Sequence, residues 1–443
     1  MKKIILLTLG AVMLFTSSCS LWKPYKSTST APSDLYSGFE SDSTSNYGQL
    51  GWRNIFTDPN LQALIDTALV RNSDVRSQQL SIEKAETSYK VSKLAYLPTL
   101  YFSPTGQLSN ISGDQYNYAN IVANASWQID LFGSITNKKR QAKASLALEQ
   151  DYKQSIECRL ISSLATYYYN LVMLDEQKRV EEESAKLWEE NLTTMRALYD
   201  AGYYRSPAIN QSEAQLSGIR IDLLTIDEQI DAAQTAICTL LGKPTQHVNR
   251  GTIDQFQMPE VVGVGVPAQL LVNRPDVRAA ERKIEIAYYD YNISRAALFP
   301  NITISANGGW TTPLGWVING IASLSQPIFA GGKLRGNVKI AKASKEQAVI
   351  AFEQTVIEAG GEVADALKGC KTSAEKAPLY KDQVRAYQDA YDANRELMNT
   401  GTSTYLEVLT AQQSLLSAQL AEISNKQAGI KSLITLYAAL GGK

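Results

Sequence analysis

The chain has 443 residues and a formal net charge of −1, with 43 Lys and Arg against 44 Asp and Glu. This balance argues against a nucleic-acid-binding protein and against a polybasic patch for membrane surfaces. A single histidine, His247, argues against a His-based metal site or a His general base, and we expect it to be a loop residue after Lys243-Pro244. Cys158, Cys238 and Cys370 lie singly with no CxxC spacing, so we expect buried free thiols rather than zinc or redox chemistry.

The first 18 residues have the pattern of a secretion signal. Lys2 and Lys3 precede an apolar run from Ile4 to Phe15 that is too short to span a bilayer, and small or polar residues lead to Cys19. This resembles a bacterial lipoprotein signal peptide over residues 1–18, cleaved before Cys19, whose thiol would carry a diacylglycerol as one of the two signals that firm attachment needs. A plain secretory peptide with an incidental cysteine is the alternative.

The next segment, residues 19–57, predicts a lipid-anchored, extended tether, because it is rich in Ser, Thr, Gly and Tyr and lacks periodicity. Asp58 followed by Pro59 predicts a helix start, with Asp as N-cap and Pro at the first helical position. A second helix is expected over 74–95, stopped near Pro98, because the residue before a proline avoids the helical region.

Four segments show the period-2 alternation of strands with two unlike faces. Residues 100–109, 119–131 and 301–310 alternate with Asn, Gln, Ser and Thr on one face and one violation at Val122, and residues 316–329 alternate less cleanly. Each has roughly the 9–11 residues that a tilted strand needs to cross a membrane. No later stretch approaches 18 consecutive apolar residues, so a mature chain that enters a membrane would have to do so as a β-barrel. A soluble, half-buried hairpin is the alternative for each pair.

Long helices follow the strands. Residues 134–199 contain no proline or glycine and predict a helix of about 100 Å. Its partner helix carries apolar residues at alternating spacings of 3 and 4: Leu216, Ile219, Leu223, Ile226, Ile230, Ala233, Ile237 and Leu240. A comparable stripe near the C-terminus is Leu406, Leu409, Gln413, Leu416, Leu420, Ile423, Gln427, Ile430, Ile434 and Tyr437. A spacing of 3.5 predicts left-handed coiled coils, although the two stripes occupy non-equivalent positions.

The chain also repeats itself. Residues 69–76 return as 271–278, and residues 198–242 return as 397–441 at a constant offset of 199. Each half therefore reads as helix, helix, two strands and a long helical hairpin. The expected organisation is a first structural repeat over 58–245, a linker over 246–265 and a second repeat over 266–443, with β-hairpins at about 98–131 and 300–329 and helical hairpins at about 134–242 and 333–441.

Two strands per repeat create a physical problem. An isolated ribbon in lipid leaves backbone groups at its edges unsatisfied, so four strands must close with strands of other chains. Twelve strands from three chains would enclose an aqueous channel lined by the polar faces, and the helices would extend it. The expected fold is mainly α with membrane β: a trimeric twelve-stranded β-barrel that continues into an α-helical coiled-coil tunnel, built on an internal two-fold sequence repeat.

Four motifs, taken in their order along the chain, point to a known family. They are Phe56-x-Asp58-x-x-Leu61-x-x-Leu64-Ile65-x-x-Ala68-Leu69-x-x-Asn72-x-Asp74, then Arg274-Pro275-Asp276-Val277-Arg278, Gln326-Pro327-Ile328-Phe329-x-Gly331-Gly332, and Gly401-x-x-x-Tyr405-Leu406-Glu407-Val408-Leu409-x-Ala411-Gln412. The chain resembles the TolC-like outer-membrane efflux proteins, specifically the lipid-anchored outer-membrane factors of RND-type tripartite drug and metal pumps. The resemblance implies a homotrimer in the outer membrane with a periplasmic helical tunnel, on which a periplasmic adaptor and an inner-membrane transporter dock. It implies no cofactor beyond the lipid on Cys19.

The resemblance also implies a gate at the periplasmic tip, where rings of carboxylates and a bulky apolar residue constrict the tunnel. Glu407 falls on one carboxylate position and Leu406 on an apolar one, while Thr410 occupies the second carboxylate position. The usual Arg and Tyr partners appear as Ser403 and Met398, so the polar lock is largely missing. A solvated charge at a helix tip is the alternative role for Glu407.

The expected function is therefore the exit duct of a tripartite efflux pump for drugs, metals or other small molecules. One alternative is the outer-membrane duct of a type I protein secretion system. A periplasmic coiled-coil adaptor lipoprotein is another, but it would need one helical hairpin rather than two. An enzyme is disfavoured, because no nucleophile–base pair, phosphate-cradling loop or metal cluster stands out in the sequence. The transported substrate is not encoded in any recognisable motif.

Overall fold

The computed structural model describes residues 22–27, 51–111, 114–202, 206–253, 274–312 and 314–442. Cys19 and the expected signal peptide lie outside these ranges. The described residues form two compact units, one within the ranges 1–30, 78–152 and 278–355 and the other within 31–77, 153–277 and 356–443. None of the described helices combines the length and apolarity that a membrane crossing requires.

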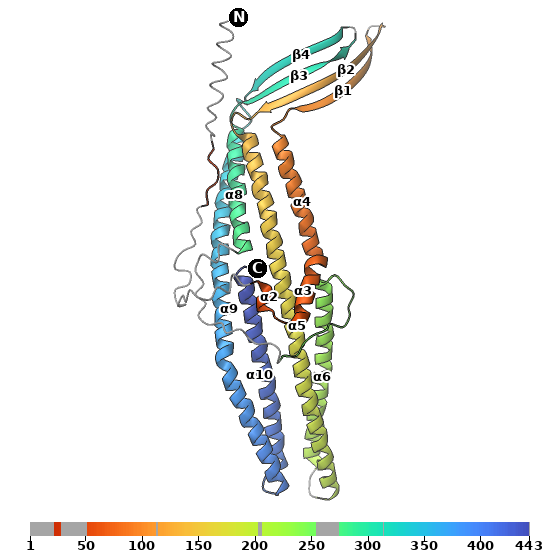
Figure 1. The fold of residues 1–443 in the computed structure, drawn as a ribbon, viewed down its shortest axis with the longest axis vertical. Coiled ribbons are helices and arrows are strands. Elements are labelled where there is room, and N and C mark those ends of the chain that lie inside the picture. Colours follow the sequence, from red (N-terminus) through yellow and green to blue (C-terminus); the bar gives the residue numbers. More distant parts are fainter. Residues whose placement is uncertain are drawn as a thin grey trace. The chain divides into compact units, whose positions relative to one another are not determined.

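The described elements are mainly helical with one antiparallel sheet (Figure 1), which confirms the expected fold class for a single chain. In chain order they are α2 (Trp52–Ile55), α3 (Pro59–Arg71), α4 (Ser73–Leu94), β1 (Thr99–Ile111), β2 (Asp114–Ile129), α5 (Ser134–Asp200), α6 (Ser206–Leu240), α8 (Pro275–Ala296), β3 (Asn301–Thr311), β4 (Gly315–Ser325), α9 (Lys333–Asn399) and α10 (Tyr405–Ala439). Helices α5 and α9 both have 67 residues, and α6 and α10 both have 35, each pair offset by the predicted 199.

The predicted helix start at Asp58 is confirmed. Asp58 is the N-cap of α3, and its Oδ1 accepts a hydrogen bond of 2.8 Å from the backbone N–H of Asn60, with Pro59 at the first position. The extended tether was wrong over Trp52–Ile55, which forms the short helix α2. The neighbouring Phe56 is fully buried and meets Tyr437 edge-to-face at 5.4 Å, so this part of the tether belongs to the core.

The four strands form one sheet in the order β1-β2-β3-β4, with antiparallel neighbours. Strands β2 and β3 approach closely at Gly309, where a Cβ would lie 2.0 Å from the carbonyl oxygen of Ile121, so no other residue fits without a shift. Strand β4 ends at Ser325 rather than reaching the predicted Phe329. Pro327 explains the early end, because it has no N–H to donate to a ladder.

A carboxylate turns the chain from the sheet into α5. Asp130 Oδ1 accepts from the N–H of Ile135 at 2.8 Å, and Asp130 Oδ2 accepts from the N–H of Thr136 at 2.7 Å. Beside this corner, the rings of Phe132 and Phe299 stack with centroids 4.9 Å apart. The corners of the two repeats therefore pack against each other directly.

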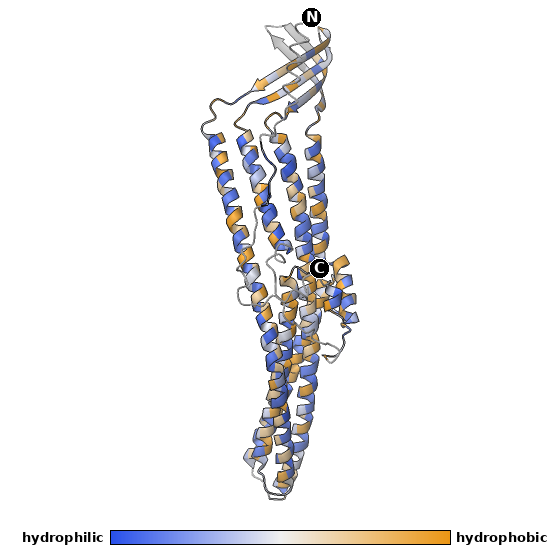
Figure 2. Ribbon diagram, turned by 60° about the vertical axis from the view of Figure 1, so that its left-hand side comes forward, coloured by the Kyte–Doolittle hydropathy of each residue, from blue (hydrophilic) through white to orange (hydrophobic). Residues whose placement is uncertain are grey.

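The second unit has its core between the long helices. The predicted apolar stripe of α6 is buried, with Ile219 and Ile237 at 1% and 0% exposure. It joins residues of α5 and one face of α10 in a single cluster. Helix α10 also buries a second face, where Val408, Ala411 and Leu415 pack with Tyr391 of α9. The alternation of apolar and polar residues along these helices is visible in Figure 2.

Candidate channel wall and helical tip

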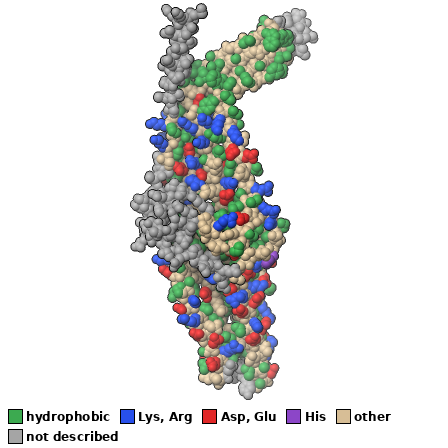
Figure 3. Space-filling model, viewed as in Figure 1, with side chains coloured by type: hydrophobic (Ala, Val, Ile, Leu, Met, Phe, Trp, Pro, Cys, Tyr) green, Lys and Arg blue, Asp and Glu red, His purple; other side chains and the backbone are tan. Residues whose placement is uncertain are grey.

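The sheet has a mainly apolar and a mainly polar face, aligned by the strand register, with Val122, Val317 and Ile321 as apolar exceptions on the polar face. Residues that share the apolar face include Leu100, Phe102, Ala123, Ala125, Trp127, Ile304, Ala306, Trp310, Trp316, Ile318, Ala322 and Leu324. Many of them are exposed in the single chain, for example Leu100 at 78% and Ile318 at 88%. Figure 3 shows hydrophobic side chains gathered over the strands. A face of this kind fits an apolar surrounding rather than water.

The opposite face carries a ladder of amides and hydroxyls. Asn319 Nδ2 donates to Asn307 Oδ1 at 3.0 Å, and Asn124 Nδ2 donates to Ser103 Oγ at 3.3 Å. Neutral side chains that donate and accept hydrogen bonds can line a water-filled passage without selecting one charged species. The polar residues predicted to line a channel are thus brought together on one surface.

The predicted gate residues lie at one tip, in the first turns of α10 next to the turn at Gly401, whose φ is +78°. Glu407 forms a capping box with Thr404, the N-cap of α10. Its Oε2 accepts from the backbone N–H of Thr404 and from Ser403 Oγ, both at 2.7 Å. These hydrogen bonds, led by the one from Ser403, lower the pKa of the Glu407 carboxyl, so it stays charged at neutral pH.

The other two gate candidates differ from Glu407 in their contacts. Leu406 is 59% exposed in the single chain, which is typical of an apolar side chain that another chain covers. Thr410 is exposed as well, and its Oγ1 donates to the carbonyl oxygen of Leu406 at 2.8 Å. Met398 stands where the family has a Tyr partner. It packs against both the main core cluster and the smaller cluster around Tyr391. Ser403, which stands where the family has an Arg partner, contacts Glu407 directly. The capping box itself could have been predicted from the pattern Thr404-x-x-Glu407.

Two equivalent side chains fasten the ends of the helical hairpins. Asn72 Nδ2 donates to the carbonyl oxygen of Leu240 at 3.0 Å, and Arg274 Nη1 donates to that of Ala439 at 3.0 Å. Residues 72 and 274 occupy the same place in the repeated segment, and 240 and 439 differ by the offset of 199. We name these contacts the Asn72 clamp and the Arg274 clamp. Each satisfies a carbonyl that a helix end leaves without a partner.

The Arg274 clamp is a charged network. The Arg274 guanidinium donates to Asp276 Oδ2 and Glu362 Oε2, each at 2.7 Å, and its side chain is only 7% exposed. Burial alone would raise the pKa of Asp276, but the hydrogen bond and charge of Arg274 hold it below its usual value. The Asn72 clamp is neutral; its Oδ1 instead caps α4 by accepting from the N–H of Asp74 at 2.9 Å.

The family model described as outer membrane efflux protein matches the chain twice, over residues 64–243 and 266–442. The two matches coincide with the two repeats and together cover most of the sequence. The chain belongs to the outer membrane efflux protein family.

Relatives within this family carry efflux names. The chain is 28% identical to the probable efflux pump outer membrane protein TtgC of Pseudomonas putida, over 99% of this chain and 95% of the relative. It is 26% identical to the cation efflux system protein CusC of Escherichia coli K12, over 97% of this chain and 98% of the relative.

Solved structures of outer-membrane channels share the fold. A CusC structure superposes with a TM-score of 0.87 at 25% identity, covering 96% of this chain and all of that one. The open-state MtrE channel of Neisseria gonorrhoeae gives a TM-score of 0.85 at 26% identity, covering 95% of this chain and 97% of that one. The predicted resemblance to TolC-like outer-membrane factors is therefore confirmed.

The three described cysteines and the single histidine of this outer membrane efflux protein lie where the sequence predicts. Cys158, Cys238 and Cys370 are free and buried, as predicted. Burial raises the pKa of both the Cys158 and Cys370 thiols to about 11, which keeps them as unreactive thiols. His247 lies exposed in the loop after α6, as expected. Among the described residues, no group of three or more His, Cys, Asp or Glu is placed to hold a metal ion.

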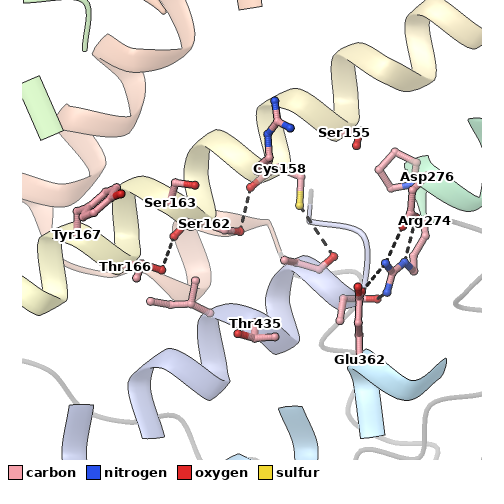
Figure 4. A pocket seen from close by; sticks show the side chains of 15 residues that line it. Ser155, Cys158, Ser162, Ser163, Thr166, Tyr167, Arg274, Asp276, Glu362 and Thr435 are labelled. Atoms are coloured by element: carbon pink, nitrogen blue, oxygen red, sulfur yellow. Dashed lines mark hydrogen bonds and ion pairs between the residues drawn. The ribbon is translucent and has the colours of Figure 1, made fainter. Parts of the chain in front are cut away.

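A cavity of about 570 Å³ adjoins the Arg274 clamp. Figure 4 shows Arg274 with Asp276 and Glu362 at one end of it, and Cys158 with Ser162 along α5. Ser162 Oγ donates to the carbonyl oxygen of Cys158 at 2.9 Å, within the same helix. The charged groups here satisfy one another, and through Arg274 they join the start of α8 to α9 and to the end of α10.

Proposed function

We propose that the protein is the exit duct of a tripartite efflux pump in the outer membrane. Three copies would close a twelve-stranded barrel, and their helices would form the periplasmic tunnel. A periplasmic adaptor and an inner-membrane transporter would dock on the helical end and deliver small molecules. Relatives are named for the efflux of toluene, antibiotics or cations, and substrate choice would rest with the transporter.

The observation that carries this proposal is the four-stranded sheet. Strand β1 pairs with β2 and strand β4 pairs with β3, which leaves one edge of each outer strand without a described partner in the chain. An edge surrounded by lipid leaves N–H and C=O groups unsatisfied at several kcal/mol each. Pairing of β4 with β1 of a neighbouring copy removes every edge, and the aligned polar faces then line the interior.

The long helices support assembly independently of the strands. Helix α6 exposes Ile221 at 62% and Leu224 at 70%, and α9 exposes Ile350 at 65% and Leu379 at 68%. Large apolar side chains on one charged helix surface are typical of faces that another helix covers. Neighbouring copies would bury these faces.

Cys19 is proposed as the lipid attachment site. The sequence pattern before it supports the proposal, and the lipid would add a second attachment to that of the strands. We expect mass spectrometry of the native protein to find an acylated N-terminal Cys19, and Cys19→Ala to abolish acyl labelling while the trimer persists. An unacylated wild-type N-terminus would contradict the proposal.

Leu406, Glu407 and Thr410 are proposed as the periplasmic gate. Three copies of Leu406 would pack around the tunnel axis, and three Glu407 carboxylates would favour cations nearby. The 59% exposure of Leu406 at a helix tip supports this placement.

The number of copies in the detergent-solubilised protein, given by its mass, tests whether three chains form the proposed duct. Native mass spectrometry should give a homotrimer, and planar bilayers of phosphatidylcholine should show stable ion conductance. A monodisperse monomer without conductance would contradict the proposal. Copurification with a proton-driven transporter and an adaptor would favour efflux, whereas copurification with a secretion ATPase would favour a protein-secretion duct.

A further inference from the structure

Positive charge is concentrated at the helix ends that adjoin the sheet. The four ranges 89–98, 132–146, 289–300 and 330–346 lead into or out of the four strands, and they contain twelve Lys and Arg but only Asp290 and Glu346 as acidic residues. We name this region the basic collar. It lies wholly within one compact unit. Figure 3 shows Lys and Arg side chains gathered across the helices next to the strands.

The collar is unlike the rest of the helical surface, because its charges have few partners in the chain. Among its described side chains, one ion pair is formed, Lys342 with Glu346 at 3.7 Å. In the other unit, by contrast, cations meet carboxylates across helices, as in Lys178–Asp227 at 2.6 Å and Arg220–Glu189 at 2.7 Å. A band of unpaired like charges is electrostatically costly and creates a potential that attracts anions.

Aromatic rings are interleaved with these cations. Lys93 lies over the ring of Tyr89 at 4.3 Å, and Lys139 lies over the ring of Tyr96 at 5.0 Å. Arg295 lies 4.2 Å from the ring of the buried Trp22. Rings with polar tips beside long cationic side chains are typical of the boundary between hydrocarbon and water, where each side chain keeps one end in each medium.

The sequence balance concealed this surface. The net charge of −1 argues against a polybasic membrane patch, but it averages over a local excess of Lys and Arg beside the strands. The four segments contribute between one and five cations each, and the first and last lie more than 230 residues apart, so only the fold collects them beside the strands. The strands begin directly at the collar, since Thr99 and Asn301, the first residues of β1 and β3, follow Pro98 and Pro300.

We propose that the basic collar binds the anionic phosphate headgroups of lipids in the membrane leaflet nearest the helices. Acyl chains would lie on the apolar strand face while Lys and Arg pair with the headgroups, which fixes how deeply the sheet sits. Charge complementarity and continuity with the apolar strands favour a lipid over any soluble anion. This surface rests on the proposed insertion of the sheet into a membrane, although its lipid preference can be measured separately.

Two sets of exposed cations allow a test that leaves the fold intact. One set is Lys90, Lys93, Lys138 and Lys143 of α4 and α5; the other is Lys333, Arg335, Lys339 and Lys342 of α9. Each set is changed to Gln in the full-length protein. The matched control changes four exposed lysines of the other unit to Gln: Lys368, Lys376, Lys381 and Lys431.

Lipid binding is measured by native mass spectrometry in neutral detergent, with phosphatidylglycerol or phosphatidylcholine added at equal concentration. The wild type and the control should retain phosphatidylglycerol about tenfold more strongly, and at least one collar set should lose this preference. Salt at 0.5 M should weaken it as well, because charge pairing at a surface is screened. Inorganic phosphate at 10 mM should not displace the lipid.

Four results would overturn the proposal. They are equal retention of both lipids by the wild type, an undiminished preference in both collar sets, displacement of the lipid by inorganic phosphate, and collar variants that keep the lipid preference and lose only binding to purified peptidoglycan. A monomeric wild type that conducts no ions but still prefers phosphatidylglycerol would contradict the proposed duct and leave the collar standing.

Discussion

Helices α6 and α10 are equivalent at an offset of 199 residues, yet they bury different faces. Leu224 of α6 is 70% exposed, while its counterpart Ile423 of α10 is 8% exposed and lies in the main core. Ile221 is likewise exposed at 62%, whereas its counterpart Leu420 packs against the core. Equivalent side chains of the two repeats are thus exposed on α6 and buried on α10.

The difference arises from what each helix packs against. Helix α10 is joined to α5 by Asn191 Nδ2 to Gln412 Oε1 at 2.8 Å and by Gln427 Nε2 to Asn170 Oδ1 at 2.7 Å. The second repeat therefore packs against the first through α10 and α5. If copies assemble in a ring, the same contact recurs between repeat one of a chain and repeat two of its neighbour. We infer that α6 would be covered by α9 of the next copy, whose apolar residues are exposed here.

Truncation of the two equivalent side chains should have unlike effects. Ile423→Ala should lower the free energy of unfolding of the chain by about 2–4 kcal/mol, because a buried side chain is replaced by a cavity. Leu224→Ala should change chain stability by less than about 1 kcal/mol but reduce the trimer fraction. Urea denaturation and native mass spectrometry separate the two effects; a monomer equally destabilised by both changes would contradict the inferred asymmetry.

The two clamps, at the other end of the hairpins, should also differ in their contribution to stability. Arg274→Met should destabilise the protein by about 2–3 kcal/mol, since Asp276 and the carbonyl of Ala439 lose a charged donor. Asn72→Ala should cost about 1–2 kcal/mol through a lost cap and one neutral hydrogen bond. Thermal unfolding of both variants at pH 7 measures the order, and a larger loss for Asn72→Ala would refute it.

Acid should distinguish the clamps further. The pKa of Asp276 is depressed in the folded chain, so the stability that it contributes is present above its ordinary value of 3.8 and is lost as pH falls through the lower folded value. The difference in stability between wild type and Arg274→Met should therefore shrink below about pH 4. The corresponding difference for Asn72→Ala should stay constant, because Asn does not titrate. Unfolding curves between pH 6 and pH 3 provide the check.

The smallest expected effects concern the tips. At the three equivalent positions only α10 carries a carboxylate, because Pro207, Ala208 and Gln211 of α6 correspond to Leu406, Glu407 and Thr410. Leu406→Ala should raise single-channel conductance. Glu407→Gln keeps the capping pattern and should weaken cation selectivity, while Thr410→Asp should strengthen it, each by less than about twofold.

Gln211→Asp is the matched control for the tip, since it adds the same charge at the equivalent position of α6. It should leave cation selectivity unchanged if the constriction is formed by α10 alone. If Leu406→Ala, Glu407→Gln and Thr410→Asp all conduct like the wild type in planar bilayers, these residues form only a helix tip.

Features set by local chemistry were predictable from the sequence. The cap at Asp58, the alternation of the strands and the α6 stripe follow from side chains within a few residues of one another, and the repeat is a direct comparison of the chain with itself. The fold class followed from these and from the edge problem of the strands.

Features that join distant segments were not predictable. The Arg274 clamp spans 165 residues, and the second buried face of α10 depends on Tyr391 of α9. The collar needs four segments at once. For Glu407, the family resemblance suggested a gate, while the local pattern Thr404-x-x-Glu407 already encoded a cap; the two roles are compatible, because the cap holds the carboxylate at the tip.

The clamps also have a mechanical consequence. Each fixes a hairpin at the end of its second helix, so a pivoting α10 would have Arg274 at its fixed end and the Leu406 tip at its moving end. A lever of 35 residues is about 50 Å long, and a swing of about 10° would carry its tip by about 9 Å. A modest pivot at a buried arginine would thus be magnified into a displacement wider than a helix radius at the far end.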